Sequence, residues 1–252
     1  MSSGTVTPAP VVESIATIMR SKLAARRLHG VVRKWINPFV GYTGTQVFCQ
    51  PRTPELEKDP AYKQLTAYVV CAGAGESGEL RILSYVRGKK GAEPRLHAKK
   101  SIGVGGHVNH DDFILADAAV REQGVDERTR KYNYTAAGCL YAGAREVNEE
   151  LLLSAVVQRV SADQLRFYGL VNCDGDQVSS VHIGVVYVCQ FNELVTSSDL
   201  ELLNPTWCTI DELVADIQAY EPWSQHLIGS IAGAIAVDRV LFTEIPRAEE
   251  SL

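Results

Sequence analysis

The stretch Arg145-Glu146-Val147-Asn148-Glu149-Glu150 decides how this chain folds and what chemistry it can carry. Four apolar or small residues recur around it at i, i+4, i+7 and i+11: Leu140, Ala144, Val147 and Leu151. That spacing predicts a helix over Ala136–Leu153 with a single buried stripe. The three glutamates fall at i, i+3 and i+4, so their carboxylates share one face of the helix.

Three carboxylates on neighbouring helical positions need a cationic partner. Like charges at i and i+4 cost a few tenths of a kcal/mol per pair. Arg145 supplies only one positive charge. A hard divalent ion such as Mg²⁺ or Mn²⁺, which prefers oxygen ligands, would neutralise more of the cluster. The alternative is a solvated acidic helix face, which is the commoner explanation of an isolated E-x-x-E-E pattern.

The segments on either side of this helix favour a sheet. Four runs rich in Val, Ile, Leu and Tyr predict strands, at Leu65–Ala72, Leu80–Arg87, Leu165–Val171 and Val181–Gln190. A glycine pair, Gly105-Gly106, ends the shorter apolar run that begins at Ser101, where backbone can approach a ligand closely. Strands interspersed with helices predict an α/β (α+β) architecture with a mixed sheet flanked by helices.

Together, the glycine pair, the glutamate helix and the strands that follow resemble the Nudix hydrolase family. The family signature reads G, five residues, E, seven residues, then R-E-U-x-E-E-x-G-U, where U is apolar. Arg145–Glu150 matches the R-E-U-x-E-E core in full, and Leu153 matches the last apolar position. The resemblance covers roughly residues 41–220 and implies a Nudix-type α/β/α sandwich with a mixed β-sheet.

The chain departs from the signature at three points. Arg145 lies 39 positions after Gly106, where the family has fourteen, which indicates an insertion at about residues 109–135. The early glutamate falls on Ala137 and the late glycine on Leu152. A second segment, Arg121–Glu127, stands nearer the family distance, but its acidic pair is one position late and Gly124 would weaken the helix.

The resemblance implies a metal-dependent pyrophosphohydrolase that cleaves the phosphoanhydride bond of a nucleoside diphosphate linked to another moiety. Its Mg²⁺ or Mn²⁺ ligands would be Glu146, Glu149, Glu150 and the Gly106 carbonyl, with Arg145 orienting a carboxylate. The alternative is a non-catalytic Nudix-scaffold module that binds or senses a nucleotide. A third, an isomerase-like use of the fold, is disfavoured because the sequence shows no obvious additional His/Cys metal set.

Substrate contacts are expected from basic residues and one histidine before the helix. The residues predicted to bind the substrate are Arg87, Arg95, Lys99 and His107, with a solvated basic loop as the alternative for the first three. The general base varies within the family, and the sequence leaves three carboxylates as candidates: Glu146, Glu193 and Glu201.

The chain is expected to divide into three parts. Residues 1–40 form an N-terminal extension with a basic amphipathic helix over residues 11–35 that packs on the main domain. The alternative is that this helix directs the protein to an organelle or binds a partner. Residues 41–220 form the Nudix domain, with a further short strand at Gln46–Gln50 and a capping box at Thr209–Glu212 that opens a helix. In residues 221–252, a helix over Trp223–Phe242 packs on the domain.

Composition and charge narrow the partners. With 46% hydrophobic and 22% charged residues the chain can bury a sizeable core, and its net charge of −5 gives no bulk reason for nucleic-acid binding. No apolar run is long enough to span a membrane. The six cysteines lack C-x-x-C pairs and indicate free thiols rather than disulfides or zinc. We expect a cytoplasmic protein with a small nucleotide-type substrate, and a homodimer is left open.

Overall fold

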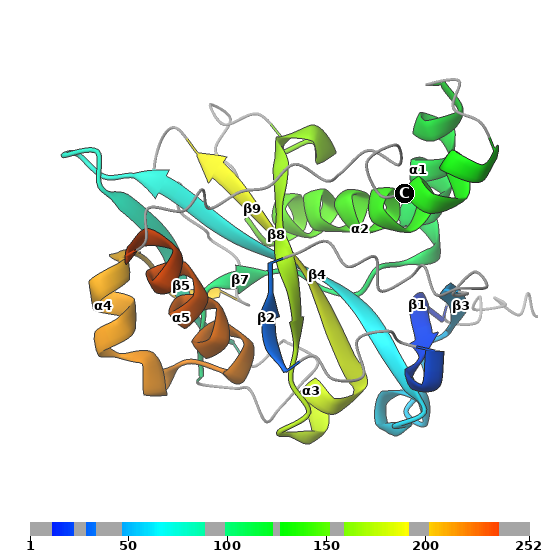
Figure 1. Cartoon of the computed structure of the whole chain (residues 1–252), viewed down its shortest axis with the longest axis horizontal. Coiled ribbons are helices and arrows are strands. Elements are labelled where there is room, and N and C mark those ends of the chain that lie inside the picture. The colour runs from blue at the N-terminus through cyan, green and yellow to red at the C-terminus, as the bar shows by residue number, and fades with distance from the viewer. Residues whose placement is uncertain are drawn as a thin grey trace, which may run out of the picture.

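The computed structural model describes residues 12–22, 29–33, 47–88, 99–122, 127–151, 159–191 and 202–236. A twisted mixed sheet runs through the centre, with the long helix α2 on one side and the helices α4 and α5 on the other (Figure 1). The helices of eight or more residues are α1 (His110–Glu122), α2 (Glu127–Glu150) and α5 (Pro222–Ala236), and the shorter ones are α3 (Gln177–Val181) and α4 (Ile210–Ala215).

The sheet follows the order β10-β5-β4-β9-β8-β2, with β1, β3, β6 and β7 paired at its margins. Its strands are β1 (Ser14–Met19), β2 (Gly30–Val32), β3 (Val47–Pro51), β4 (Tyr62–Ala74), β5 (Leu80–Arg87), β6 (Lys100–Ser101), β7 (Gly103–Val104), β8 (Leu165–Asn172), β9 (His182–Phe191) and β10 (Leu202–Thr209). The central pair β4 and β9 runs parallel, whereas the other described pairs run antiparallel.

Alternation along β4 builds the two layers of the core. Leu65, Ala67 and Val69 point to one face and pack with the buried stripe of α2, which includes Val147. Tyr68, Val70 and Ala72 point to the opposite face and pack with Leu227, Ile228 and Ile231 of α5. Because successive side chains of a strand project to opposite faces, one strand anchors both helical layers. The result is the predicted α/β/α sandwich.

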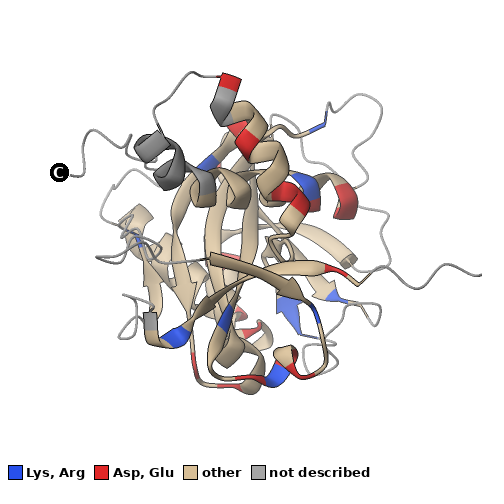
Figure 2. Cartoon of the chain, turned by 90° about the vertical axis from the view of Figure 1, so that its right-hand side faces the viewer, with Lys and Arg blue, Asp and Glu red and all other residues tan. Residues whose placement is uncertain are grey.

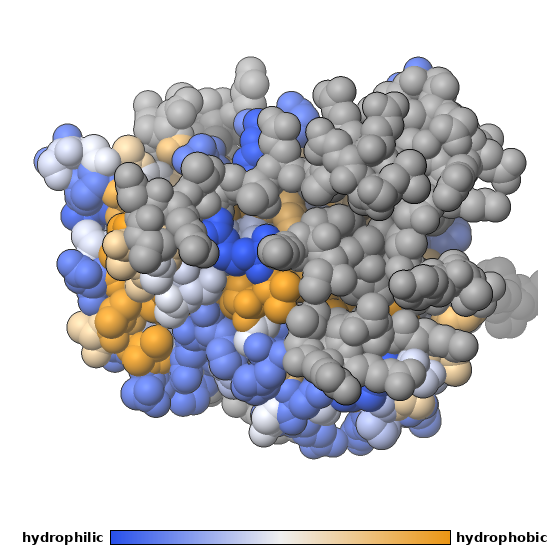
Figure 3. Space-filling view, in the orientation of Figure 1, coloured by the Kyte–Doolittle hydropathy of each residue, from blue (hydrophilic) through white to orange (hydrophobic). Residues whose placement is uncertain are grey.

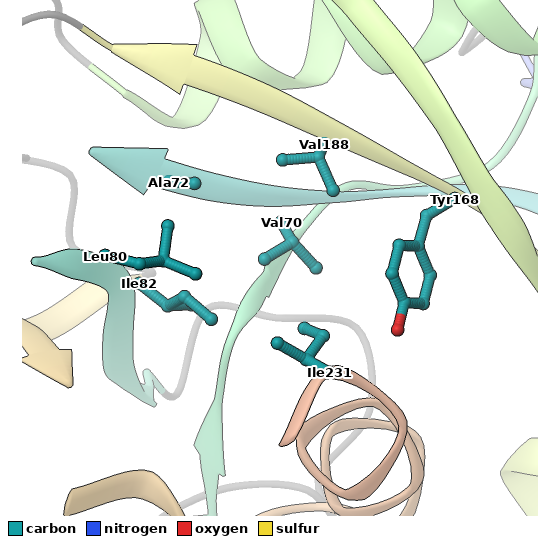
Figure 4. Close-up of a pocket in the computed structure, with 7 residues that line it drawn as sticks. All are labelled: Val70, Ala72, Leu80, Ile82, Tyr168, Val188 and Ile231. Carbon is teal, nitrogen blue, oxygen red and sulfur yellow. The ribbon is translucent and has the colours of Figure 1, made fainter. Parts of the chain in front are cut away.

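The α5 layer contains a small apolar pocket. Side chains from the sheet point towards Ile231 of α5 across it (Figure 4). Its lining residues are Val70, Ala72, Leu80, Ile82, Tyr168, Val188 and Ile231. Apolar atoms also reach the surface over the α4–α5 corner (Figure 3), where Val214 and Ile235 are exposed. No helix among the described residues is long and apolar enough to cross a membrane.

Most of the expected elements are confirmed. The four predicted long strands correspond to β4, β5, β8 and β9, and the short strand predicted at Gln46–Gln50 corresponds to β3. Thr209 caps α4, and its hydroxyl accepts from the Glu212 backbone N–H as the capping box requires. The glutamate helix begins earlier than expected, at Glu127. The insertion predicted at about residues 109–135 therefore forms α1 and the first turns of α2.

The helix predicted over residues 11–35 is wrong for the part of that segment that the structure describes. Ser14–Met19 is β1, which pairs with both β3 and β4, and Gly30–Val32 is β2, which pairs with β8. Four consecutive residues of β1 are buried, and strand pairing with the sheet outweighed the helical pattern of basic residues. The extension predicted for residues 1–40 thus contributes strands to the central sheet.

The edge strand β10 was not expected, because Asn204-Pro205 indicates a loop. Both residues lie at a bulge in this strand, where the register of β10 against β5 shifts between Leu203 and Thr206. Asn204 adopts a positive φ of 51° at this bulge, which asparagine tolerates better than most residues. Proline lacks a backbone N–H, and an edge strand is where a sheet can accept it.

Candidate active site

The glycine pair and the glutamate helix meet through close backbone packing. A Cβ on Gly106 would lie 2.5 Å from Oε1 of Glu146, and a Cβ on Gly105 would overlap the Ala67 carbonyl of β4. Only glycine therefore lets the Glu146 carboxylate approach this backbone. The Gly106 carbonyl accepts a hydrogen bond from the Ala67 N–H at 3.0 Å, so one of its two lone pairs is already used.

Arg145 forms a two-pronged ion pair with Asp112 of α1. Its Nε donates to Oδ1 of Asp112 at 3.0 Å and its Nη2 donates to Oδ2 at 3.0 Å. The Asp112 side chain is only 1% exposed, and its Oδ2 also accepts from the Asn109 backbone N–H at 2.8 Å. A planar guanidinium matched to a carboxylate in this way fixes the direction of both groups. The pair ties α2 to the start of α1.

The same guanidinium also contacts the glutamate cluster. Its Nη1 donates to Glu146 at 2.8 Å and to Glu149 at 3.1 Å, and its Nη2 donates to the His107 carbonyl at 3.0 Å. One positive charge therefore faces the three carboxylates of Asp112, Glu146 and Glu149. Acidic segments gather on the helices that face the viewer in Figure 2. The excess of negative charge suits a cation.

Glu146 is the most perturbed carboxyl of the cluster. Its side chain is 13% exposed. Burial raises its pKa to about 7, and the Glu149 and Asp112 charges add to this rise while Arg145 opposes it. A carboxyl whose charge is disfavoured in this way would be stabilised as a carboxylate by a bound divalent ion. Perturbed carboxyls of this kind are typical of functional sites.

Glu150, the last residue of α2, lies close enough to the sheet for its charge to act on buried groups there. Its negative charge raises the pKa of the buried Cys71 and Tyr85, although in both groups burial is the larger cause. Burial alone would lower the pKa of Arg87. The surrounding groups, among them Glu221 and Glu150, have the larger combined effect and raise that pKa. The Arg87 N–H also donates to the Lys99 carbonyl at 3.0 Å. Two of the predicted substrate-binding residues are therefore neighbours.

His107 contributes its backbone, rather than its ring, to the Arg145 contacts. Its Nε2 lies 2.8 Å from Oε1 of Gln64 and 3.1 Å from Nε2 of His182. Because Nδ1 of His182 must donate to the Val178 carbonyl, at 2.7 Å, a neutral His182 has Nε2 as an acceptor. Burial, as the largest cause, lowers the pKa of both histidines, which fits a neutral pair. The predicted contact of the His107 ring with substrate stays a prediction.

The structure thus brings together Arg145, Glu146, Glu149 and Gly106, and Glu150 follows on α2 one turn after Glu146. Five residues that the signature or the site predictions named lie outside the described residues: Arg95, Leu152, Leu153, Glu193 and Glu201. Asp112 was missed, since it lies in the predicted insertion and lacks a recognisable pattern. Its position at the start of a helix, beside Asp111, was the only available signal.

The competing segment Arg121–Glu127 falls elsewhere. Glu122 ends α1 and Glu127 begins α2, and the residues between them lie outside the described residues. Ala137, where the family signature has its early glutamate, lies on α2 upstream of Arg145. This helix thus carries the R-E-V-N-E-E core without that glutamate.

Comparisons with known proteins agree with this geometry at the level of the fold. No protein-family model matches the chain. Protein YmaB of Bacillus subtilis (strain 168) is 29% identical over 181 residues, which cover 70% of this chain and 75% of YmaB. Its name states no activity.

Two solved structures align with this chain, and the first of them is similar in fold. Tm1382, described as a candidate Nudix hydrolase, aligns with a TM-score of 0.59 and 23% identity over 88% of this chain and 99% of that chain. The NUDIX hydrolase from Alicyclobacillus acidocaldarius aligns with a TM-score of 0.49 and 13% identity over 72% of this chain and 98% of that chain. The first comparison confirms the architecture that the R-E-V-N-E-E resemblance implied: this chain has the Nudix hydrolase fold.

Proposed function

We propose that the chain is a metal-dependent pyrophosphohydrolase that acts at the carboxylate cluster of α2. The observation that carries the proposal is the position of Arg145, which joins Asp112, Glu146 and Glu149 beside Gly106. Arg145 leaves two of the three negative charges uncompensated. The glycine backbone leaves room for the Glu146 carboxylate and for a ligand next to it.

The proposed ligands of Mg²⁺ or Mn²⁺ are the carboxylates of Glu146, Glu149 and Glu150 and the free lone pair of the Gly106 carbonyl. These are hard oxygen donors, which both ions prefer. Glu149 is the most accessible of them, because its side chain is 58% exposed. The raised pKa of Glu146 supports the assignment, since a neighbouring cation is the missing group that would stabilise the charge there.

When bound, the ion would neutralise pyrophosphate oxygens and lower the pKa of a coordinated water molecule. Arg145 and Asp112 hold Glu146 and Glu149 in place, so these carboxylates need little reorganisation as charge develops. Of the three general-base candidates from the sequence, we propose Glu146, because it is the one that the structure describes within the carboxylate cluster.

The proposed substrate is a nucleoside diphosphate linked to another moiety. Arg87 ends β5 and Lys99 directly precedes β6, where their backbones are hydrogen-bonded, and the charge of Glu150 acts on Arg87. Their positive charges would attract the phosphates of a nucleotide towards the metal. The moiety beyond the diphosphate is left open, because specificity in a fold comes from the loops around the site.

The test is a screen of phosphate release over a panel of nucleoside diphosphate derivatives with Mg²⁺ or Mn²⁺. Phosphatase is added as a coupling enzyme, so that it releases inorganic phosphate from the monophosphate products. We expect the wild-type chain to hydrolyse at least one derivative. In Glu149→Gln and in Glu150→Gln the rate of hydrolysis should fall by a factor of about 100 or more. Glu76→Gln is the matched control, because Glu76 is an exposed acid in the turn between β4 and β5.

Two outcomes would overturn the proposal. Equal rates in the wild type and in both glutamine variants would exclude the cluster as the catalytic site. Tight nucleotide binding by calorimetry without hydrolysis of any derivative would favour the alternative, a non-catalytic sensor. That alternative has one observation in its favour, the alanine at position 137, where the family signature has a glutamate.

A further inference from the structure

A second group of metal-binding side chains lies on the opposite face of the sheet. His29, Cys173 and His226 bring one nitrogen or sulfur donor atom each within 4.8 Å of one another. His29 directly precedes β2, Cys173 directly follows β8, and His226 projects from α5. Pairing of β2 with β8 sets Gly30 opposite Asn172, which places His29 and Cys173 at the same end of the two strands. Three elements therefore converge on this group.

The backbone at Gly30 brings the two histidines together. Gly30 has a φ of +81°, a left-handed conformation that favours glycine, and the chain turns there directly after His29. A Cβ at Gly30 would lie 3.5 Å from Nδ1 of His226, so the imidazole of α5 packs against this turn. The His29 and His226 rings meet edge to face with centroids 5.1 Å apart.

The three donors are also available for coordination. Among the described residues, none of the three side chains makes a hydrogen bond or an ion pair. Cys173 is only 5% exposed. Its sulfur is therefore buried, and among the described residues it has no hydrogen-bond partner.

We propose that His29, Cys173 and His226 form a zinc site separate from the carboxylate cluster. Two imidazoles and one thiolate are donors that bind Zn²⁺ in preference to Mg²⁺ or Ca²⁺. In tetrahedral zinc, neighbouring N and S ligands stand about 3.5 Å apart, so donors already within 4.8 Å need only small side-chain rotations. The exposed side of His29 leaves the fourth position to water. On binding, the Cys173 thiol loses its proton to solvent as the Zn–S bond forms.

The zinc site is independent of the proposed hydrolase site. Cys173 belongs to the core layer that packs on α5, whereas Val147 of the glutamate helix belongs to the layer on the other face. The donor sets also differ in kind, since the α2 cluster offers only oxygen. A zinc ion here would tie β2, β8 and α5 together and so stabilise the N-terminal part of the sheet.

The test uses the full chain, stripped of metal with a chelator and titrated with Co²⁺ as a spectroscopic substitute for zinc. We expect one equivalent of Co²⁺ to produce a thiolate-to-cobalt charge-transfer band that Zn²⁺ then abolishes. Cys173→Ser should lose the band. His29→Gln and His226→Gln should weaken binding at least about tenfold. Zinc should raise the thermal unfolding midpoint of the wild type and leave that of His29→Gln unchanged.

The controls separate this site from other cysteines and from α2. Cys208→Ser, on β10, should keep the band with wild-type affinity, and so should Glu149→Gln. A band that is missing in the wild type or that persists in Cys173→Ser would overturn the proposal. His29 is exposed, so His29→Gln tests the site even if Cys173→Ser fails to fold. Equal Co²⁺ affinity in His29→Gln and the wild type would overturn it as well.

Discussion

The two faces of the central sheet carry chemically different groups. On the α2 face, one guanidinium holds three carboxylates together beside a glycine backbone. On the α5 face, two imidazoles and a thiol stand at the margin of an apolar layer without charged partners. The first set suits a hard ion shared with phosphates, and the second suits zinc. The comparison teaches that one sheet can position both donor sets, because it lies between α2 on one face and α5 on the other.

The faces also differ in how they affect stability. Burial, to which the charges of Glu149 and Asp112 add, disfavours the Glu146 carboxylate in the metal-free fold, as its raised pKa shows. The α5 face is held by apolar burial, to which each fully buried Leu or Ile side chain contributes about 1.5–3 kcal/mol. Substitutions on α2 should therefore change catalysis and metal binding, and substitutions in the α5 core should change stability alone.

The largest effect is expected from Asp112→Asn, which removes the buried partner of Arg145. Leaving a partly buried guanidinium without this partner should lower the free energy of unfolding by about 3 kcal/mol. The rate of hydrolysis should fall roughly 100-fold because the glutamates lose their orienting contact. Urea denaturation and phosphate release measure the two effects. Asp111→Asn, at the 93% exposed neighbouring aspartate, is the control and should change neither.

Ile231→Ala should have the opposite profile to a substitution on the α2 face: it should lower stability without changing the rate of hydrolysis. Ile231 is 3% exposed and lines the apolar pocket between α5 and the sheet. Its truncation should cost about 3 kcal/mol in unfolding free energy and leave the hydrolysis rate per folded molecule unchanged. Ile235→Ala, on an exposed residue of the same helix, should stay within about 0.5 kcal/mol of the wild type. A rate loss in Ile231→Ala would mean that the two faces are coupled.

Glu146→Gln should stabilise the metal-free chain while it abolishes hydrolysis. A carboxyl whose folded pKa is about 7, above its unfolded value, contributes stability below the unfolded value and loses it as pH rises to 7. At pH 8 the glutamine variant should therefore be about 3 kcal/mol more stable than the metal-free wild type. The difference should vanish at pH 4. Thermal unfolding across this pH range, without metal, provides the measurement, and a pH-independent difference would contradict the assignment.

The smallest effect is expected from Gly106→Ala. The added methyl group would meet the Glu146 carboxylate at 2.5 Å and displace it. Mn²⁺ affinity should fall roughly tenfold, because a displaced ligand binds with poorer geometry. Gly229→Ala is the control: a Cβ there meets nothing within 4 Å, and alanine favours the α5 helix. Unchanged Mn²⁺ affinity in Gly106→Ala would remove Gly106 from the site.

The sequence predicted the parts of this protein whose signals are local. The R-E-V-N-E-E helix and the strands β4, β5, β8 and β9 follow from periodicity, and the role of Gly106 beside Glu146 follows from the family resemblance. Signals that depend on distant partners were missed. Arg145 and Asp112 are 33 positions apart, and nothing around Asp112 distinguishes it from an ordinary helix start.

The wrong prediction for residues 11–35 and the unrecognised histidine–cysteine group have the same cause. β1 is a strand because β3 and β4 pair with it, whereas the sequence of residues 11–35 alone resembles a basic helix. The His29–Cys173–His226 group has no motif, since its members come from three separate elements. In each case tertiary pairing decides the outcome, and a single sequence carries no local record of it.

The central claim is that the carboxylates of α2 hold a divalent ion, and a Mn²⁺ titration followed by electron paramagnetic resonance tests it most directly. The signal of free Mn²⁺ measures binding to the metal-free wild type and to the double variant Glu149→Gln/Glu150→Gln. We predict saturable binding by the wild type and at least about tenfold weaker binding by the double variant. Equal binding by the two proteins would contradict the account.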